Sequence, residues 1–132
     1  VEEINPDSDT IGNIVIMVER SLTFWKEYGP IIKDGFTFEG GYTDIVSSGD
    51  GDYLTRDTLW DFKVSKEEPK SKYTLQLLMY YIMGCHSIHP EFKQIEKLGI
   101  FNPRKNKVYI ANISLISPEI IEKVSRDVIG YK

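Results

Sequence analysis

Three charged residues lie on two short β-forming segments that flank the polar residues 55–58. This pattern predicts a β-hairpin in which Asp52 lies directly opposite Asp61. Side chains alternate along a strand, so Lys63 joins Asp61 on the same face. The opposite face then carries aromatic side chains directed toward the core, namely Tyr53, Trp60 and Phe62.

Two facing carboxylates destabilise a sheet unless a partner offsets their charge. They also form an oxygen site for a hard divalent cation such as Mg²⁺ or Mn²⁺. A cation held there polarises a phosphate and activates water, and Lys63 is placed to orient that water or to stabilise charge on the phosphate. The alternative is a solvated acidic hairpin tip in which Asp61 and Lys63 are ordinary surface charges. The opposed Asp52 argues against that alternative.

Gln76 and Tyr80 are four residues apart in a segment that is otherwise apolar, so they share one face of a predicted helix. A glutamine on the packed side of such a helix needs a hydrogen-bond partner, which a phosphate, a metal-bound water or a backbone group supplies. The alternative is a core tyrosine beside a boundary glutamine.

The sequence resembles the PD-(D/E)XK nuclease superfamily, in particular its RecB-like branch. The resemblance depends on three motifs in chain order: Asp52 on a strand, Asp61-Phe62-Lys63 on the next strand, and Gln76 with Tyr80 on a helix. The resemblance covers about residues 40–84. It implies that the two aspartates bind the metal, that the lysine is catalytic, and that the glutamine and tyrosine support the site near the metal and the DNA backbone. It further implies a restriction-endonuclease-like core.

Two features of the resemblance leave alternatives open. Asp44, in Gly41-Tyr42-Thr43-Asp44, also matches the loose motif of the first acid, although the hairpin register favours Asp52. The family commonly adds a glutamate from the helix before the sheet, for which Glu19 is the best candidate and simple surface exposure the alternative. Asp50 lies opposite Lys63 in the predicted register, as its ion-pair partner or as a supporting acid.

The elements that must position these residues follow from hydrophobic periodicity and from turn and cap residues. The helices are expected at 9–28 after the caps Asp7-Ser8-Asp9, at 72–84, at 90–97 as a short helix, and from Pro118 to Gly130. The strands are expected at 35–46 with a bend at Gly40-Gly41, at 52–54, at 59–64, at 98–101 and at 107–116. This order predicts an α/β fold with a central mixed β-sheet flanked by α-helices.

The composition of 132 residues, 41% hydrophobic and 27% charged, predicts a single domain over residues 1–132 without a membrane-spanning segment. The start at Val1-Glu2-Glu3 is compatible with a piece of a longer chain. A single cysteine fits a reducing, cytoplasmic setting. The net charge of −4 disfavours nucleic-acid binding by bulk electrostatics, so binding is expected to depend on a bound cation or a local basic face.

The turn around Arg104, Lys105 and Lys107 is the local basic face, with a solvated hairpin tip as the alternative. The segment 85–89 contains one cysteine and two histidines, but this crowding is poor zinc spacing and favours a loop. We therefore expect a Mg²⁺-dependent deoxyribonuclease acting on DNA, with RNA as an open alternative and a helicase, repair or defence protein as partner. The alternatives are a catalytically inactive nuclease-fold module for nucleic-acid or protein binding, and a plain interaction domain.

Overall fold

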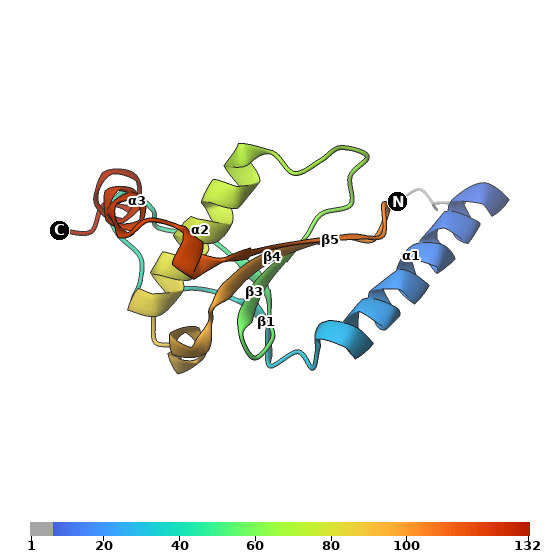
Figure 1. Ribbon diagram of the computed structural model, residues 1–132, viewed down its shortest axis with the longest axis horizontal. Helices are drawn as coiled ribbons and strands as arrows, with labels where there is room; N and C mark the ends of the chain where they lie inside the picture. The colour runs from blue at the N-terminus through green and yellow to red at the C-terminus, as the bar shows by residue number, and fades with distance from the viewer. Residues whose placement is uncertain (1–6) are drawn as a thin grey trace, which may run out of the picture.

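The computed structural model describes residues 7–132, so the chain start at Val1-Glu2-Glu3 lies outside the described part. A five-stranded mixed sheet with the order β1-β2-β3-β4-β5 is flanked by helices, as predicted (Figure 1). Strands β3 and β4 are parallel, and every other neighbouring pair is antiparallel. The strands are β1 (Lys33–Phe36), β2 (Gly51–Leu54), β3 (Thr58–Phe62), β4 (Lys97–Asn102) and β5 (Lys107–Asn112). The helices are α1 (Ser8–Tyr28), α2 (Ser71–His86), η1 (Pro90–Gln94), η2 (Ile113–Leu115), α3 (Pro118–Lys123) and η3 (Val124–Ile129).

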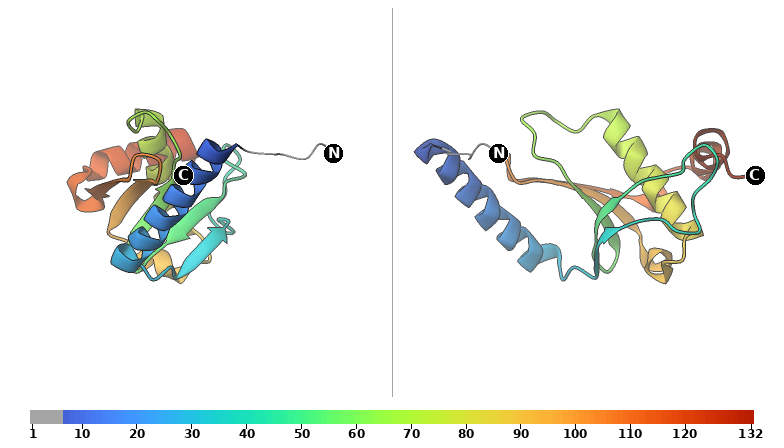
Figure 2. Two further views of the ribbon diagram at one scale, coloured as in Figure 1. Left: turned by 90° about the vertical axis from the view of Figure 1, so that its right-hand side faces the viewer. Right: turned by 180° about the vertical axis from the view of Figure 1, so that it is seen from behind.

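Helix α1 covers one face of the sheet with its C-terminal part. It begins where the Asp7 carboxylate accepts a hydrogen bond of 2.8 Å from the Thr10 N–H, which is the predicted cap. Phe24 is buried and lies 4.7 Å from the Trp60 ring and 4.2 Å from the Phe101 ring, measured between centroids. The N-terminal part of α1 projects beyond the sheet (Figure 2).

Helix α2 connects the parallel strands β3 and β4 and packs on the opposite face of the sheet. Its apolar residues join side chains from the sheet, η1 and η3 in the main core. The buried members from α2 are Leu77, Leu78, Ile82 and Met83. This packing fixes the position of the polar residues Gln76 and Tyr80 relative to the strands.

The predicted strand over 35–46 is wrong beyond Phe36, because residues 37–50 form a loop that packs on α2. Phe38 is fully buried, with its ring centroid 4.9 Å from that of Tyr80. The Tyr42 hydroxyl accepts a 3.0 Å bond from the Phe38 N–H and donates a 3.2 Å bond to the Gly49 carbonyl. The β-forming aromatic residues of this segment thus anchor a loop instead of continuing a strand.

The C-terminal strand and helix lie where the sequence predicts them, but their ends differ from the prediction. Strand β5 ends at Asn112, not at 116, because the Ile113 N–H donates to the Glu96 carbonyl at 2.9 Å and the chain turns into η2. The last helix begins at Pro118 as predicted and widens to the π-helical η3 before Gly130, whose φ of 100° ends it. Within residues 7–132, no helix combines the length and apolarity needed to cross a membrane.

Candidate active site

The β2–β3 hairpin has the predicted register. Tyr53 pairs with Trp60 and Leu54 with Leu59, so the next residues outward on the α2 side are Asp52 and Asp61. The Phe62 N–H donates a 3.0 Å hydrogen bond to Asp52 Oδ2, which fixes that carboxylate across the hairpin. The aromatic face is also confirmed, and it packs against α1.

The Asp61 carboxylate is the electrostatically strained group of the hairpin. Its side chain is 18% exposed, and its Oδ2 atom is buried without a hydrogen-bond partner among the described residues. Burial, and next the hydrogen bond with the Asp52 carboxyl, raise the pKa of Asp61 to about 7, and the Lys63 charge only partly opposes this. The pair therefore holds a proton near neutral pH, which a cation would displace.

Lys63 lies between this carboxylate and helix α2. Its backbone N–H donates to the Phe101 carbonyl at 3.0 Å, which extends the contact with β4 beyond the end of β3. Its Nζ is 3.3 Å from Asp61 Oδ2 and 4.6 Å from the centre of the Tyr73 ring. The predicted ion pair between Lys63 and Asp50 is wrong, because Asp61 occupies that role and Asp50 is exposed at the wall of the pocket.

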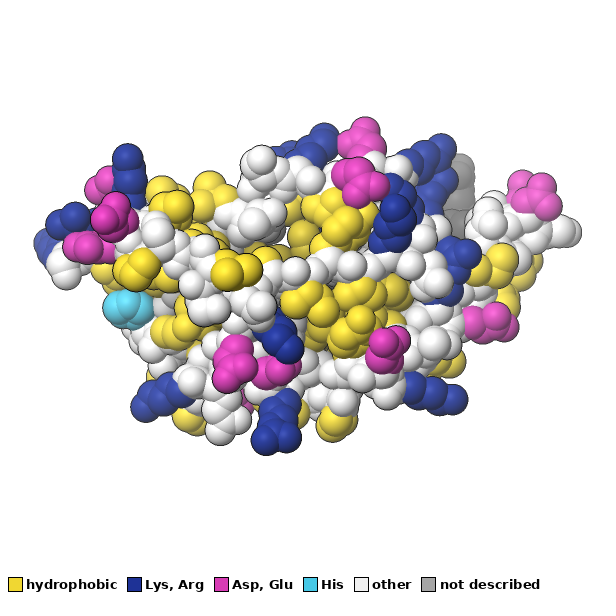
Figure 3. All heavy atoms as spheres, viewed as in Figure 1, with side chains coloured by type: hydrophobic (Ala, Val, Ile, Leu, Met, Phe, Trp, Pro, Cys, Tyr) yellow, Lys and Arg dark blue, Asp and Glu magenta, His cyan; other side chains and the backbone are white. Residues whose placement is uncertain are grey.

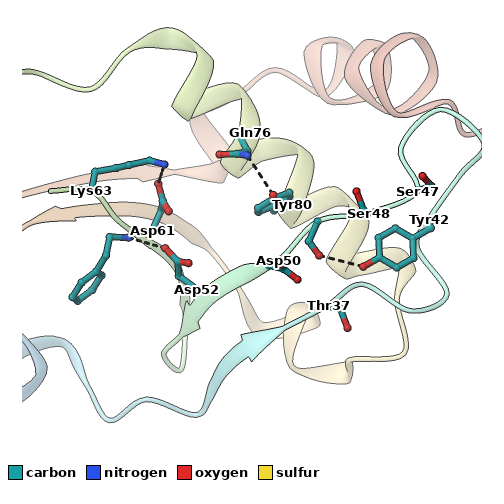
Figure 4. Close-up of a pocket in the computed structure, with 12 residues that line it drawn as sticks. Thr37, Tyr42, Ser47, Ser48, Asp50, Asp52, Asp61, Lys63, Gln76 and Tyr80 are labelled. Carbon is teal, nitrogen blue, oxygen red and sulfur yellow. Dashed lines mark hydrogen bonds and ion pairs between the residues drawn. The ribbon is translucent and has the colours of Figure 1, made fainter. Parts of the chain in front are cut away.

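Gln76 and Tyr80 share a face of α2, as predicted, and this face looks toward the hairpin (Figure 4). Gln76 Nε2 donates a 3.3 Å hydrogen bond to the Tyr80 hydroxyl. The loop closes on Tyr80 at Gly49, where a Cβ would lie 3.1 Å from the tyrosine ring. Gly49 thus permits the close contact between the loop and the helix.

These elements enclose an open pocket of about 590 Å³, and all five predicted catalytic residues line it. They are Asp52, Asp61, Lys63, Gln76 and Tyr80. The opposite wall is not predicted from the sequence, and it is formed by Thr37, Tyr42, Ser47, Ser48 and Gly49. The run of small hydroxyl residues directly before Asp50 was the available signal, but it also fits an ordinary turn. Tyr73, which lies under the Lys63 ammonium, was missed as well, although it precedes Gln76 by three residues on the same helix.

Glu19 does not reach this pocket, so its prediction as a metal ligand is not met. It is exposed on α1, and α1 packs on the other face of the sheet through its aromatic residues. Across residues 7–132, no group of three or more histidine, cysteine or acidic side chains is arranged to hold a metal. Asp44 is exposed outside the pocket lining, so Asp52 is the acid beside Asp61.

The basic turn is present but is partly neutralised by Glu68. Lys105 Nζ lies 2.6 Å and Lys107 Nζ 3.9 Å from Glu68 Oε1. The hydrogen bonds from Lys105 and Tyr109 are the main reason why the pKa of Glu68 is lowered to about 2. Arg104 is exposed, and its carbonyl accepts a hydrogen bond from Arg20.

The cysteine and histidines of 85–89 do not converge on one point. The His86 ring stacks on Tyr131 with centroids 3.8 Å apart, whereas His89 Nε2 lies 2.7 Å from the Thr37 carbonyl. This divergence agrees with the interpretation as a loop at the end of α2.

Comparison of the chain with protein-family models, with curated proteins and with solved structures found no match.

Proposed function

We propose that this chain is a metal-dependent nuclease of the PD-(D/E)XK type that hydrolyses DNA phosphodiester bonds. The observation that carries the proposal is the convergence of Asp52, Asp61 and Lys63 with the Gln76–Tyr80 pair on one pocket. The topology supports it at a coarser level, because a β1-β2-β3 meander, a helical crossover and a parallel β4 make up a mixed sheet flanked by helices.

The donor set at the hairpin fits a hard divalent cation. Asp52 and Asp61 would hold Mg²⁺ or Mn²⁺ through carboxylate oxygens, and Mg²⁺ is usually bound by one or two carboxylates together with water and substrate phosphates. Asp61 Oδ2 is buried with the Lys63 ammonium beside it, and burial next to Asp52 raises the pKa of Asp61, so a cation between the two carboxylates would offset the cost of ionising both. A bound cation would polarise the scissile phosphate and make a water molecule more acidic.

The remaining side chains have roles that follow from their positions. The Lys63 ammonium, held between Asp61 and the Tyr73 ring, would orient the attacking water or stabilise charge developing on the phosphate. The Gln76 amide is exposed at the pocket wall and would donate to a phosphate oxygen, while Tyr80 fixes its orientation. The hydroxyl residues of the opposite wall would contact the nucleic-acid backbone.

A cleavage assay on linear, circular and single-stranded DNA, and on RNA, with Mg²⁺ or Mn²⁺ tests this function. We expect Asp61→Asn and Lys63→Met each to lower the rate by roughly 100-fold or more, because each removes a group that acts on the reacting phosphate. Asp44→Asn is the matched control, since this exposed acid lies outside the pocket lining and its substitution should leave the rate unchanged.

Metal-dependent cleavage that survives both site substitutions would refute the mechanism. Metal or DNA binding without cleavage of any substrate would support the alternative, a nuclease-fold module without turnover.

A further inference from the structure

We propose that helix α1 is a dimerisation helix whose partner is the α1 helix of a second copy of this chain, paired antiparallel. This inference is independent of the proposed nuclease activity. The surface concerned is the apolar stripe of α1, defined as Ile11, Ile14, Val15, Val18 and Leu22. All five side chains are exposed, Val18 to 53% and Leu22 to 60%.

The spacing of the stripe is that of a helix–helix seam. Four members of the stripe, Ile11, Val15, Val18 and Leu22, and then Trp25 follow one another in alternating steps of four and three, and Ile14 lies beside this line. This repeat keeps apolar side chains on one line along a helix and suits insertion between the side chains of a second helix. The last residue of this line, Trp25, already packs on Tyr53 and Phe62, so the seam begins at the sheet and continues into solvent.

Within the described part of the chain, residues 8–16 of α1 are all exposed, so this part of the helix has little packing to support it. It is rich in β-branched residues and contains Gly12, both of which disfavour an isolated helix. Among residues 7–132, packing places nothing within 4 Å of a Cβ built at Gly12, so no contact of the described part requires glycine there. A partner helix would supply the missing packing, and Gly12, at the flank of the stripe, would allow it a close approach.

The area of the stripe also suits a partner of this size. Five aliphatic side chains, each about half exposed, present on the order of 500 Å² of apolar surface, comparable to the largest patches of monomeric proteins. Two such stripes facing each other would bury on the order of 1,000 Å² in total, which is the lower limit for a specific interface. Hydrophobic side chains are visible on α1 at the right-hand end of the molecule (Figure 3).

Geometry selects the antiparallel orientation of the second copy. The N-terminal part of α1 projects away from the sheet, and only the C-terminal part is attached to it (Figures 1 and 2). An antiparallel pair therefore lays each free half beside the attached half of its partner, with the two sheets at opposite ends. The opposed helix dipoles favour the same arrangement. No residue of α1 lines the candidate active site, so both pockets stay open.

Sedimentation equilibrium of the chain over a micromolar concentration range tests the proposal. We expect twice the mass of one chain for the natural sequence. Val15→Glu and Val18→Glu should each raise the dimer dissociation constant by roughly 100-fold or more, because each buries two unpaired charges in the dimer. Thr23→Glu is the control, since it adds the same charge to an exposed site of α1 off the stripe and should leave the mass unchanged.

Circular dichroism separates dissociation from unfolding, because both valines are exposed and their replacement should leave the sheet domain folded. In a Cys85→Ser background, spin labels at Thr10→Cys should lie far from each other across an antiparallel pair and close together in a parallel one. A natural chain that remains monomeric at every concentration, a dimer that persists in both valine variants, or closely spaced labels would each overturn the proposal.

Discussion

The two faces of the β2–β3 hairpin have opposite effects on stability, although their residues alternate along the same two short strands. On the α1 side, Tyr53 and Trp60 lie in a cluster of stacked and edge-on aromatic rings that leaves Trp60 almost completely buried. On the α2 side, Asp52 and Asp61 place two carboxylates together at the wall of a pocket. One face stabilises the fold, whereas the other places two carboxylates together and thereby reduces its stability.

The difference shows how a short hairpin supports an unfavourable site. Leu54 and Leu59, fully buried on the same face as the two acids, and the Trp60 indole hold the register. The Trp60 indole N–H also donates a 3.0 Å hydrogen bond to Thr55 Oγ1 in the adjoining turn. Substitutions on the two faces should therefore change stability with opposite signs.

The largest effect is expected on the aromatic face. Trp60→Ala removes a large buried side chain and leaves Thr55 without its indole donor, so it should lower the free energy of unfolding by about 3–5 kcal/mol. Chemical denaturation monitored by circular dichroism measures this. A loss below about 1 kcal/mol, the range of exposed positions, would mean that this cluster does not hold the hairpin.

A smaller effect of opposite sign is expected on the acidic face. The pKa of Asp61 is raised from 3.8 to about 7, so the folded state keeps this proton more tightly than the unfolded state does. The stability that this difference provides is complete below pH 3.8 and is lost as the pH rises through 7. Asp61→Asn should therefore raise the free energy of unfolding at pH 8 by roughly 1–2 kcal/mol and give no gain at pH 4.

Thermal denaturation of both proteins at pH 4, 6 and 8 measures this difference. Asp44→Asn is the control, and its melting curve should follow that of the natural sequence at each pH. A variant at Asp61 that is less stable than the natural sequence at pH 8 would contradict the interpretation of the acidic face.

The hairpin illustrates which parts of this molecule the sequence could predict. Its register depends only on the turn and on alternation along two adjacent strands, and the shared face of Gln76 and Tyr80 depends only on helical spacing. Both features are local, and both were predicted correctly. The five catalytic candidates reach one pocket because the crossover from β3 through α2 to β4 brings these two local patterns together.

The errors concern packing between distant segments. The resemblance implies a glutamate from the helix before the sheet and so predicts Glu19 at the site, but the sequence does not reveal that the aromatic residues of α1 select the opposite face. The segment 37–50 has the composition of a strand, yet Phe38 and Tyr42 contact α2 and hold it as a loop. Its hydroxyl residues therefore reach the pocket by a route that composition does not predict.

The smallest effect is expected at the basic turn, outside both faces of the hairpin. Glu68→Gln should free Lys105 and Lys107 from their acidic partner and strengthen DNA binding by less than about tenfold, with a steeper salt dependence. Fluorescence anisotropy with a labelled duplex at several salt concentrations measures this. Lys105→Ala should change binding little, and a large loss in that variant would show that the lysine contacts phosphate despite Glu68.

Calorimetric titration with Mn²⁺ at pH 7 tests most directly whether the acidic face is a cation site. The natural sequence and Asp44→Asn should bind the ion and release protons into the buffer, because the cation displaces the proton that Asp61 holds near neutral pH. Asp61→Asn and Asp52→Asn should lose this binding. Equal binding by all four proteins, or no binding by the natural sequence, would contradict the assignment of Asp52 and Asp61 as metal ligands.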